Sequence, residues 1–349
     1  MGDRQRESGH FVGRLAVVAC ALLMVLPAAA DWKQAVAYYN QGKFDLAIQE
    51  LKPDLDKSPD WEGGHRLAGL CYLNLKNNAL AIVELSRAVQ LQSKEFTTFQ
   101  SLAQAYFNTD KLDNCIQILN QGEQFAKDPN DLYRLHHLRG AAYYRLQKYD
   151  QSDVDLSAAI RIKSSDWVDF SQLGVDYYNL NRIDEAVQML QKALTLKPGD
   201  NATSSILGKA YFKQGVAALT DKQYNQAIDL FHKAGTYTPN DGYVFYNTGE
   251  AYLFLNSYPE AEKAYNQALG LLPRNPDIYQ RLGYLYEKQK KFDQALGAYQ
   301  KAGDLNPPPP VKADIYYRMG MINETQKKTD QALTSGTQAR APPRSSGRR

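Results

Sequence analysis

The sequence predicts an all-α fold built as a solenoid, in which about nine helix–turn–helix units stack in a row. The first observation is a tyrosine that returns at a nearly constant interval. Steps between successive copies are 34 or 37 residues, and the one longer step, of 75, is the sum of 34 and 41. A period of this length is typical of stacked helical repeats. The tyrosines of this period are Tyr38, Tyr72, Tyr106, Tyr143, Tyr177, Tyr252 and Tyr286.

Small and large residues accompany the tyrosine period. Three residues before each tyrosine stands a glycine or alanine, a second small residue follows 12 positions later, and a large apolar residue comes four positions after that. Residues three or four apart share one helix face. Small residues on that face allow two helices to approach closely. The first small residues are Ala35, Gly69, Ala103, Gly140, Gly174, Gly249 and Gly283, and the large ones are Leu51, Leu85, Leu119, Leu156, Leu190, Tyr265 and Tyr299.

This pattern resembles the tetratricopeptide repeat, a helix–turn–helix unit of about 34 residues with small residues where its two helices cross. The resemblance covers nearly all of the chain after residue 30. It implies a right-handed superhelical α-solenoid whose first helices pack through a stripe such as Phe170, Gly174 and Tyr177. Each helix pair leaves a hydrophobic face that the next pair covers.

The predicted domain boundaries follow the repeat. We expect a signal peptide over residues 1–30, a solenoid over 31–335 and a disordered basic tail over 336–349. The nine units are expected near 31–61, 62–95, 96–132, 133–166, 167–201, 202–241, 242–276, 277–312 and 313–335.

The sixth unit departs from the period by seven extra residues and offers two candidate small positions, Gly208 and Gly215. Seven residues are close to two helical turns, so an insertion of this length keeps the apolar face in phase. We therefore predict one lengthened first helix, from about Thr203 to Leu219.

The ninth unit is degenerate and is predicted to act as a cap. It keeps Gly320, but Asn323 stands where the tyrosine is expected, and its second helix, around 330–334, is short. The preceding run from Pro307 to Pro310 is predicted to be extended rather than helical. Terminal repeats are often atypical because they meet solvent.

The N-terminus has the pattern of a secretory signal peptide. Arg4, Arg6 and Arg14 precede an apolar run over 15–26, and three alanines follow at 28–30. The run is short for a membrane span, so we predict export, to the periplasm of a bacterium, with cleavage after Ala30. A lipoprotein cleaved before Cys20 and an uncleaved anchor are the two alternatives.

The charge and the cysteines exclude several classes of protein. The chain has 41 Lys and Arg against 38 Asp and Glu, a formal net charge of +3, which is no basic field of the kind that binds nucleic acid. Cys71 occupies a position beside the tyrosine stripe, and Cys115 occupies a small-residue position of the repeat. Both are predicted to be buried free thiols.

No motif for catalysis, metal or cofactor binding occurs in the sequence. There is no Cys-x-x-Cys pair, no glycine-rich phosphate loop and no His-Glu-x-x-His. His136 and His137 are adjacent, so a helix directs them to different sides and they do not chelate one ion together. We expect no enzyme activity, no cofactor and no metal.

The family resemblance implies a binding groove on the concave surface, lined by positions 2, 5, 9, 12 and 13 of the first helices. Asparagine occupies the last of these positions in four of the first five units, with aromatic residues beside it. This is similar to the asparagine ladder of O-linked N-acetylglucosamine transferases, in which amides contact a peptide backbone. The alternative is that each asparagine only ends its helix. The candidate groove residues are Trp32, Tyr39, Asn40, Asn74, Phe107, Asn108, Tyr144, Arg145, Tyr178, Asn179, Phe212 and Tyr246.

These observations predict a scaffold of the cell envelope that binds an extended peptide or protein segment in its groove. Two alternatives remain at this point. One is a structural protein that self-assembles through its terminal repeats. The other is an accessory subunit of an envelope complex for secretion, pilus assembly or polysaccharide export. The expected partner is a protein of unknown identity or a second copy of the chain, with no nucleic acid and no membrane span in the mature form.

Overall fold

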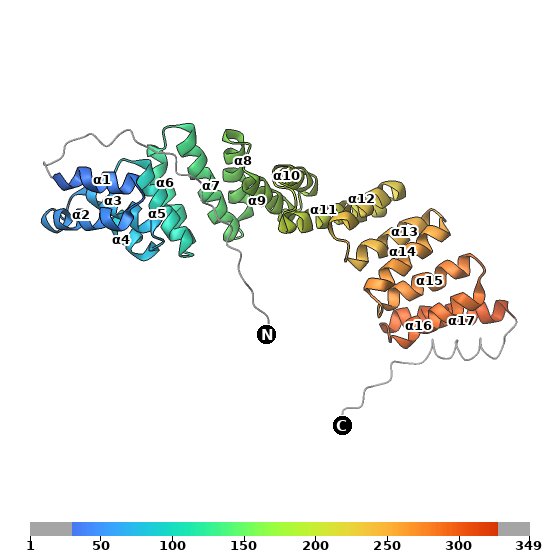
Figure 1. The fold of residues 1–349 in the computed structure, drawn as a ribbon. Helices are drawn as coiled ribbons and strands as arrows, with labels where there is room; N and C mark the ends of the chain where they lie inside the picture. The colour runs from blue at the N-terminus through green and yellow to red at the C-terminus, as the bar shows by residue number, and fades with distance from the viewer. Residues whose placement is uncertain (1–29, 327–349) are drawn as a thin grey trace, which may run out of the picture. The chain divides into compact units, whose positions relative to one another are not determined.

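The computed structural model describes residues 30–326, which form an all-α solenoid of repeated helix pairs (Figure 1). This part of the chain contains seventeen α-helices, one short 3-10 helix and no strand. It falls into two compact units, one ending at Lys148 and the other beginning at Tyr149. The predicted signal peptide, the basic tail and the second helix expected near 330–334 lie outside the described residues.

The helices of the first unit are α1 (Ala30–Asn40), α2 (Phe44–Lys57), α3 (Glu62–Asn74), α4 (Asn78–Gln90), α5 (Phe96–Asn108), α6 (Leu112–Gly122), the 3-10 helix η1 (Glu123–Phe125) and α7 (Pro129–Arg145). Those of the second unit are α8 (Tyr149–Ile162), α9 (Trp167–Asn179), α10 (Ile183–Leu196), α11 (Asn201–Thr220), α12 (Tyr224–Tyr237), α13 (Gly242–Phe254), α14 (Tyr258–Leu271), α15 (Pro276–Lys288), α16 (Phe292–Asp304) and α17 (Pro309–Thr325).

The tyrosine period is also a backbone period, because each tyrosine stands at the same place before a helix end. The carbonyl of Tyr72 accepts the N–H of Asn77 at 2.9 Å, and the residue between the helices, Lys76, adopts a left-handed φ of 58°. This is the Schellman ending of a helix. In the lengthened sixth unit Ala218 takes the tyrosine's place and accepts the N–H of Gln223 at 2.8 Å.

The predicted close crossing of paired helices is confirmed. A Cβ added to Gly174 on α9 would lie 2.6 Å from Cγ of Leu190 on α10, so only glycine fits there. The lengthened helix is also confirmed as α11, and Gly215 is the residue that meets the second helix of that pair, through Phe231. Gly208 instead faces Thr238 at the end of α12.

The cores of both units are built from the predicted small and large residues. Ala47 and Leu51 lie in one cluster of the first unit, and Leu190 lies in the main cluster of the second. Cys71 and Cys115 are buried free thiols, as predicted. Of the seven periodic tyrosines, Tyr177 is buried, and the other six are half-buried and pack against hydrophobic clusters of the two units.

The expectation that residues 307–310 are non-helical is wrong for the second half of that run, since Pro309 and Pro310 form the first turn of α17. Proline is accepted there because the first helical N–H groups have no intrahelical partner. Likewise α7 begins at Pro129, before the expected start near Tyr133. The extra residues that precede the fourth and ninth units thus lengthen the first helix of each. Within residues 30–326, no helix combines the length and the apolar character needed to cross a membrane.

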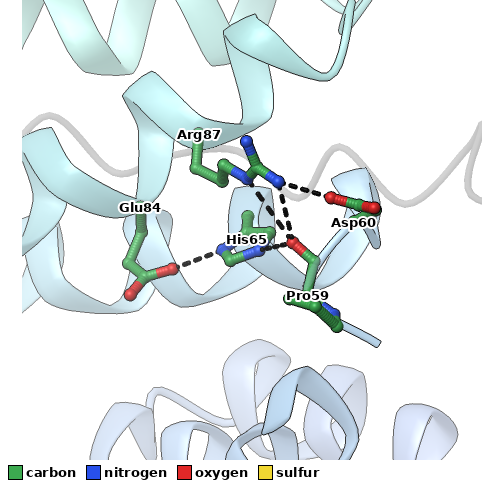
Figure 2. A network of polar contacts seen from close by, with 5 residues as sticks. All are labelled: Pro59, Asp60, His65, Glu84 and Arg87. Carbon is green, nitrogen blue, oxygen red and sulfur yellow. Dashed lines mark hydrogen bonds and ion pairs between the residues drawn. The ribbon is translucent and has the colours of Figure 1, made fainter. Parts of the chain in front are cut away.

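A polar network joins α3, α4 and the loop after α2 in the first unit (Figure 2). His65 Nε2 donates to the Pro59 carbonyl at 2.9 Å, while Nδ1 lies 2.7 Å from a carboxylate oxygen of Glu84. Arg87 donates to the same carbonyl and pairs with Asp60. The loop backbone is therefore held by side chains from both helices of the second repeat.

Candidate functional site

The four predicted asparagines all lie at the same structural position, the last residue of a first helix. Asn40, Asn74, Asn108 and Asn179 end α1, α3, α5 and α9, and all four are exposed. The amides of Asn74 and Asn179 donate to carbonyls of their own helices at 2.8 and 2.9 Å. Two of the four therefore use a donor on their own helix end, which favours the helix-ending explanation for them.

Asn108 is used between repeats. Its Nδ2 donates to the side-chain oxygen of Asn78 at 3.0 Å, and its Oδ1 accepts from Gln104 at 2.9 Å. Asn78 begins α4, so this bond ties α5 to the preceding helix pair. Contact with a ligand remains a prediction for Asn40, Asn74 and Asn179. To contact a ligand, Asn108 would have to break its hydrogen bonds to Asn78 and Gln104.

The aromatic candidates of the first unit are largely occupied by intramolecular packing. Trp32 is 6% exposed and packs edge-on against Trp61, with ring centroids 5.0 Å apart. It belongs to the core, where its ring offers little area to a ligand. Tyr39 packs against Phe44 at 5.6 Å, and burial raises the pKa of the Tyr39 hydroxyl.

Arg145 and Phe107 form a contact between neighbouring repeats. The guanidinium lies 4.8 Å from the ring centroid, donates to the Phe107 carbonyl at 3.2 Å and pairs with Asp110 at 2.7 Å. Arg145 therefore fastens the end of α7 to the turn after α5. Its neighbour Tyr144 is half-buried.

The candidates of the second unit lie on first helices that contact one another, α9 with α11 and α11 with α13. Lys213 Nζ stands 4.2 Å from the ring centroid of Tyr178, joining α11 to α9. Phe212 and Tyr246 are half-buried against Phe231 and Tyr265. We call this side of the second unit the first-helix face.

A cavity of about 450 Å³ opens on the first-helix face where α13, α15 and α17 meet. It occupies the repeat positions at which a groove is expected, but in later repeats than the asparagines. Its lining is formed by Glu250, Leu253, Phe254, Asn256, Tyr258, Gln280, Arg281, Tyr284, Lys288, Asp314 and Arg318.

One residue of the lining is a buried carboxylate. Glu250 is 6% exposed, accepts a hydrogen bond from the hydroxyl of Tyr265 and lies 3.1 Å from Nη2 of Arg281. Burial raises the pKa of Glu250, and Arg281 works against that rise. Burial also acts to lower the pKa of Arg281, but the Glu250 carboxylate outweighs it and the pKa is raised. The pair connects α13 to α15.

The same arrangement recurs one repeat later. Tyr299 donates to Glu287 at 2.9 Å, and the same carboxylate oxygen lies 3.4 Å from Nη1 of Arg318. Both tyrosines reach the face over a glycine: a Cβ on Gly249 or Gly283 would stand 2.6 Å from a ring atom of Tyr265 or Tyr299. Core tyrosines thereby position carboxylates, and each carboxylate holds an arginine of the next first helix.

Aromatic and positively charged side chains line the cavity. The ring centroid of Tyr284 is 5.0 Å from both Lys288 Nζ and the Arg318 guanidinium carbon. Phe254 is 54% exposed and stacks on Tyr224 at 5.1 Å. An apolar surface thus borders a group of cations.

None of the residues that line this cavity is among the candidates predicted from the sequence. Glu250 and Lys288 occupy predicted groove positions, and applying those positions to the seventh and eighth units would have found them. Arg281 and Arg318 lie outside the predicted positions and enter the cavity because carboxylates of the preceding repeat bind them. Tyr246 is a predicted residue that contacts this network, because its ring centroid lies 6.1 Å from that of Tyr265.

Comparison with known sequences supports the repeat assignment. A profile of the tetratricopeptide repeat matches residues 212–277, 246–310 and 280–346, and a second profile of that repeat matches residues 170–197. The chain is a tetratricopeptide repeat protein. No curated protein matches the sequence.

Several solved structures are similar to parts of this chain. The crystal structure of MamA is 24% identical and covers 48% of this chain and 92% of its own, with a TM-score of 0.38. YrrB, described as a TPR protein with an unusual peptide-binding site, is 16% identical over 54% of this chain and 92% of its own, with a TM-score of 0.42. The C-terminal part of a TPR repeat-containing protein from Cytophaga hutchinsonii is 18% identical over 72% and 99%, with a TM-score of 0.47.

Proposed function

We propose that this protein is a non-enzymatic scaffold that holds an extended segment of a partner protein on the first-helix face of its second unit. The repeat fold supports a role in protein–protein interaction. The observation that supports the location is the cavity between α13, α15 and α17, where exposed aromatic surface borders fixed charges. In binding sites of this kind, apolar side chains provide the contact surface and a few polar groups fix the orientation of the ligand.

We also propose that the protein acts in the cell envelope after export. The support is the N-terminal order of arginines, a short apolar run and three alanines before residue 31. N-terminal sequencing of protein from the periplasmic fraction is expected to begin at Asp31. A chain that keeps its first thirty residues in the cytoplasm, or one blocked at Cys20, contradicts this assignment.

Site-specific photo-crosslinking in cells tests the binding face. A photoreactive amino acid at Phe254 or Tyr317, both exposed on first helices, should form adducts with a partner protein. The control is the same residue at Lys263, which is exposed on the second helix α14. Peptide mapping of the adducts is expected to place both crosslinks in one short segment of the partner.

The outcomes separate the proposal from self-assembly. Adducts at Phe254 and Tyr317 with one partner segment, and none at Lys263, support a segment bound along the first helices. Adducts that contain only a second copy of this chain favour self-assembly. Equal labelling at all three positions refutes a preferred face.

A further inference from the structure

Both ring nitrogens of His65 face oxygen atoms that accept hydrogen bonds (Figure 2). Nε2 lies 2.9 Å from the Pro59 carbonyl, and Nδ1 lies 2.7 Å from a carboxylate oxygen of Glu84. A neutral imidazole has one N–H, so either tautomer directs a lone pair at one of these oxygens. Both contacts are hydrogen bonds only when one further proton is present, on the ring or on the carboxylate. The His65–Glu84 pair is therefore a site for one proton.

The position of the pair strengthens the attraction between an imidazolium and a carboxylate. The side chains of His65 and Glu84 are 13% and 22% exposed, so water screens the two charges only in part. A charge-assisted hydrogen bond of this kind is stronger than a neutral one. Phe99 and Phe170 occupy the position equivalent to His65 in the third and fifth units, so the packing of the repeat does not itself require a titratable group there.

The other charged groups on α3 and on the elements packed against it do not use Glu84. Among the described residues, His65 is its one ion-pair partner. Burial, with the Glu84 carboxylate as a further cause, raises the pKa of the Tyr72 hydroxyl, which is uncharged at neutral pH. Arg87 donates to the same carbonyl as His65, and its pairing with Asp60 offsets its charge. The α5 helix also contacts α3 and carries no charged side chain. The remaining ion pairs are Arg66 with Glu62 and Lys57 with Asp54.

The pair supports the loop that joins the first repeat to the second. The Pro59 carbonyl belongs to this loop, and Trp61 follows two residues later. The Trp61 ring packs against Trp32 of α1, with ring centroids 5.0 Å apart. Loss of the proton leaves His65 with one favourable contact instead of two, so it weakens the attachment of the loop that places Trp61.

We propose that the His65–Glu84 pair is a pH-sensitive switch, which holds the joint between the first and second repeats closed when it binds a proton and loosens that joint when the proton leaves. A site that binds its proton more tightly in the folded chain stabilises the fold at low pH, and that stability is lost as the pH rises. Because imidazole titrates near neutral pH, the change is expected between about pH 6 and pH 8.

Nuclear magnetic resonance of the ring nitrogens measures the proton directly, on the full chain prepared with isotope-labelled histidine. His65→Gln identifies the signals of His65 by their disappearance. In Glu84→Gln the new amide can donate to Nδ1, so a neutral ring keeps both contacts. This variant should bind the proton about tenfold more weakly than the parent chain, which lowers the midpoint of the His65 titration by about one pH unit.

Urea unfolding followed by tryptophan emission measures the effect on the joint. The chain has three tryptophans, so in a Trp167→Phe background the emission comes from Trp32 and Trp61 of the first unit. The urea midpoint of the parent should fall as the pH rises from about 6 to 8, and that of Glu84→Gln should fall less. His232→Gln, at an exposed histidine of α12, is the control and should follow the parent.

A His65 titration that depends on Glu84, together with the steeper pH profile of the parent, supports the switch. Equal titration midpoints in the parent and in Glu84→Gln overturn it. So do parallel pH profiles of unfolding, because an equal loss of stability at every pH indicates a structural contact alone. If Glu84→Gln does not fold, His65→Gln replaces it in the unfolding comparison, and a profile parallel to that of the parent again overturns the switch.

Discussion

Replacing Asp176 by asparagine should stabilise the second unit, and the gain should grow with pH. Asp176 is 0% exposed on α9, at a repeat position that holds alanine in α1, α5, α7 and α13. Burial, with the Asp153 carboxylate as a further cause, raises the pKa of Asp176 from 3.8 to about 7, while the nearby Ser152 hydroxyl acts in the opposite direction. A carboxylate therefore replaces a small apolar residue in the packing between helix pairs.

The sign of the effect follows from proton linkage. The folded chain binds the Asp176 proton more tightly than the unfolded chain, so folding is most favoured below pH 3.8 and loses stability as pH rises to about 7. A pKa raised from 3.8 to about 7 corresponds to a loss of about 4 kcal/mol in the free energy of unfolding. The stability of the asparagine variant lacks this dependence on pH. However, the buried N–H donors of its amide lower the free energy of unfolding by about 1–3 kcal/mol if they find no acceptor. At about pH 8.5 we expect a net gain of about 1–3 kcal/mol, and at about pH 5 a smaller gain or a loss.

Urea unfolding followed by circular dichroism at several pH values measures this effect. Asp229→Asn is the matched control, because Asp229 is exposed on α12. The difference between Asp176→Asn and the parent chain should increase from about pH 5 to pH 8.5, while that of the control stays flat. A pH slope identical in the parent and in Asp176→Asn would refute the reasoning.

Three further predictions concern packing, thiols and the loop network. Gly174→Ala should lower the free energy of unfolding by about 1–3 kcal/mol because the added Cβ meets Leu190. Gly270→Ala on α14, where no atom lies within 4 Å of the added Cβ, should instead raise the free energy of unfolding by about 0.5–1 kcal/mol. Urea titrations compare the two variants, and equal effects would contradict the close crossing of α9 and α10. Burial raises the pKa of Cys71 and of Cys115 to about 12, so iodoacetamide at neutral pH should label neither thiol until urea unfolds the chain, as mass spectrometry would show. His65→Ala removes two side-chain bonds around Pro59 and should cost about 1–3 kcal/mol, and an unchanged unfolding midpoint would show that the network contributes nothing.

The repeat architecture was predictable because it depends on local spacing. Helix faces repeat every three to four residues, so Gly174 and Leu190 identify the crossing of their two helices without knowledge of distant residues. The lengthened α11 was predictable for the same reason, since an insertion of two turns preserves the apolar face. The start of α17 was not predicted, because proline disfavours the interior of a helix but is accepted in its first turn, where Pro309 and Pro310 lie.

The amino-acid sequence alone determined the all-α repeat, the pairing of its helices and the burial of Cys71 and Cys115. It left open which groove positions are free for a ligand, and the fold showed Trp32 packed in the core and Asn108 bonded between repeats. Only the packed helices revealed the cavity, because Tyr265 reaches Glu250 across one helix pair and Glu250 reaches Arg281 across the next. These contacts depend on the distances between stacked repeats, which residue spacing within one repeat does not specify.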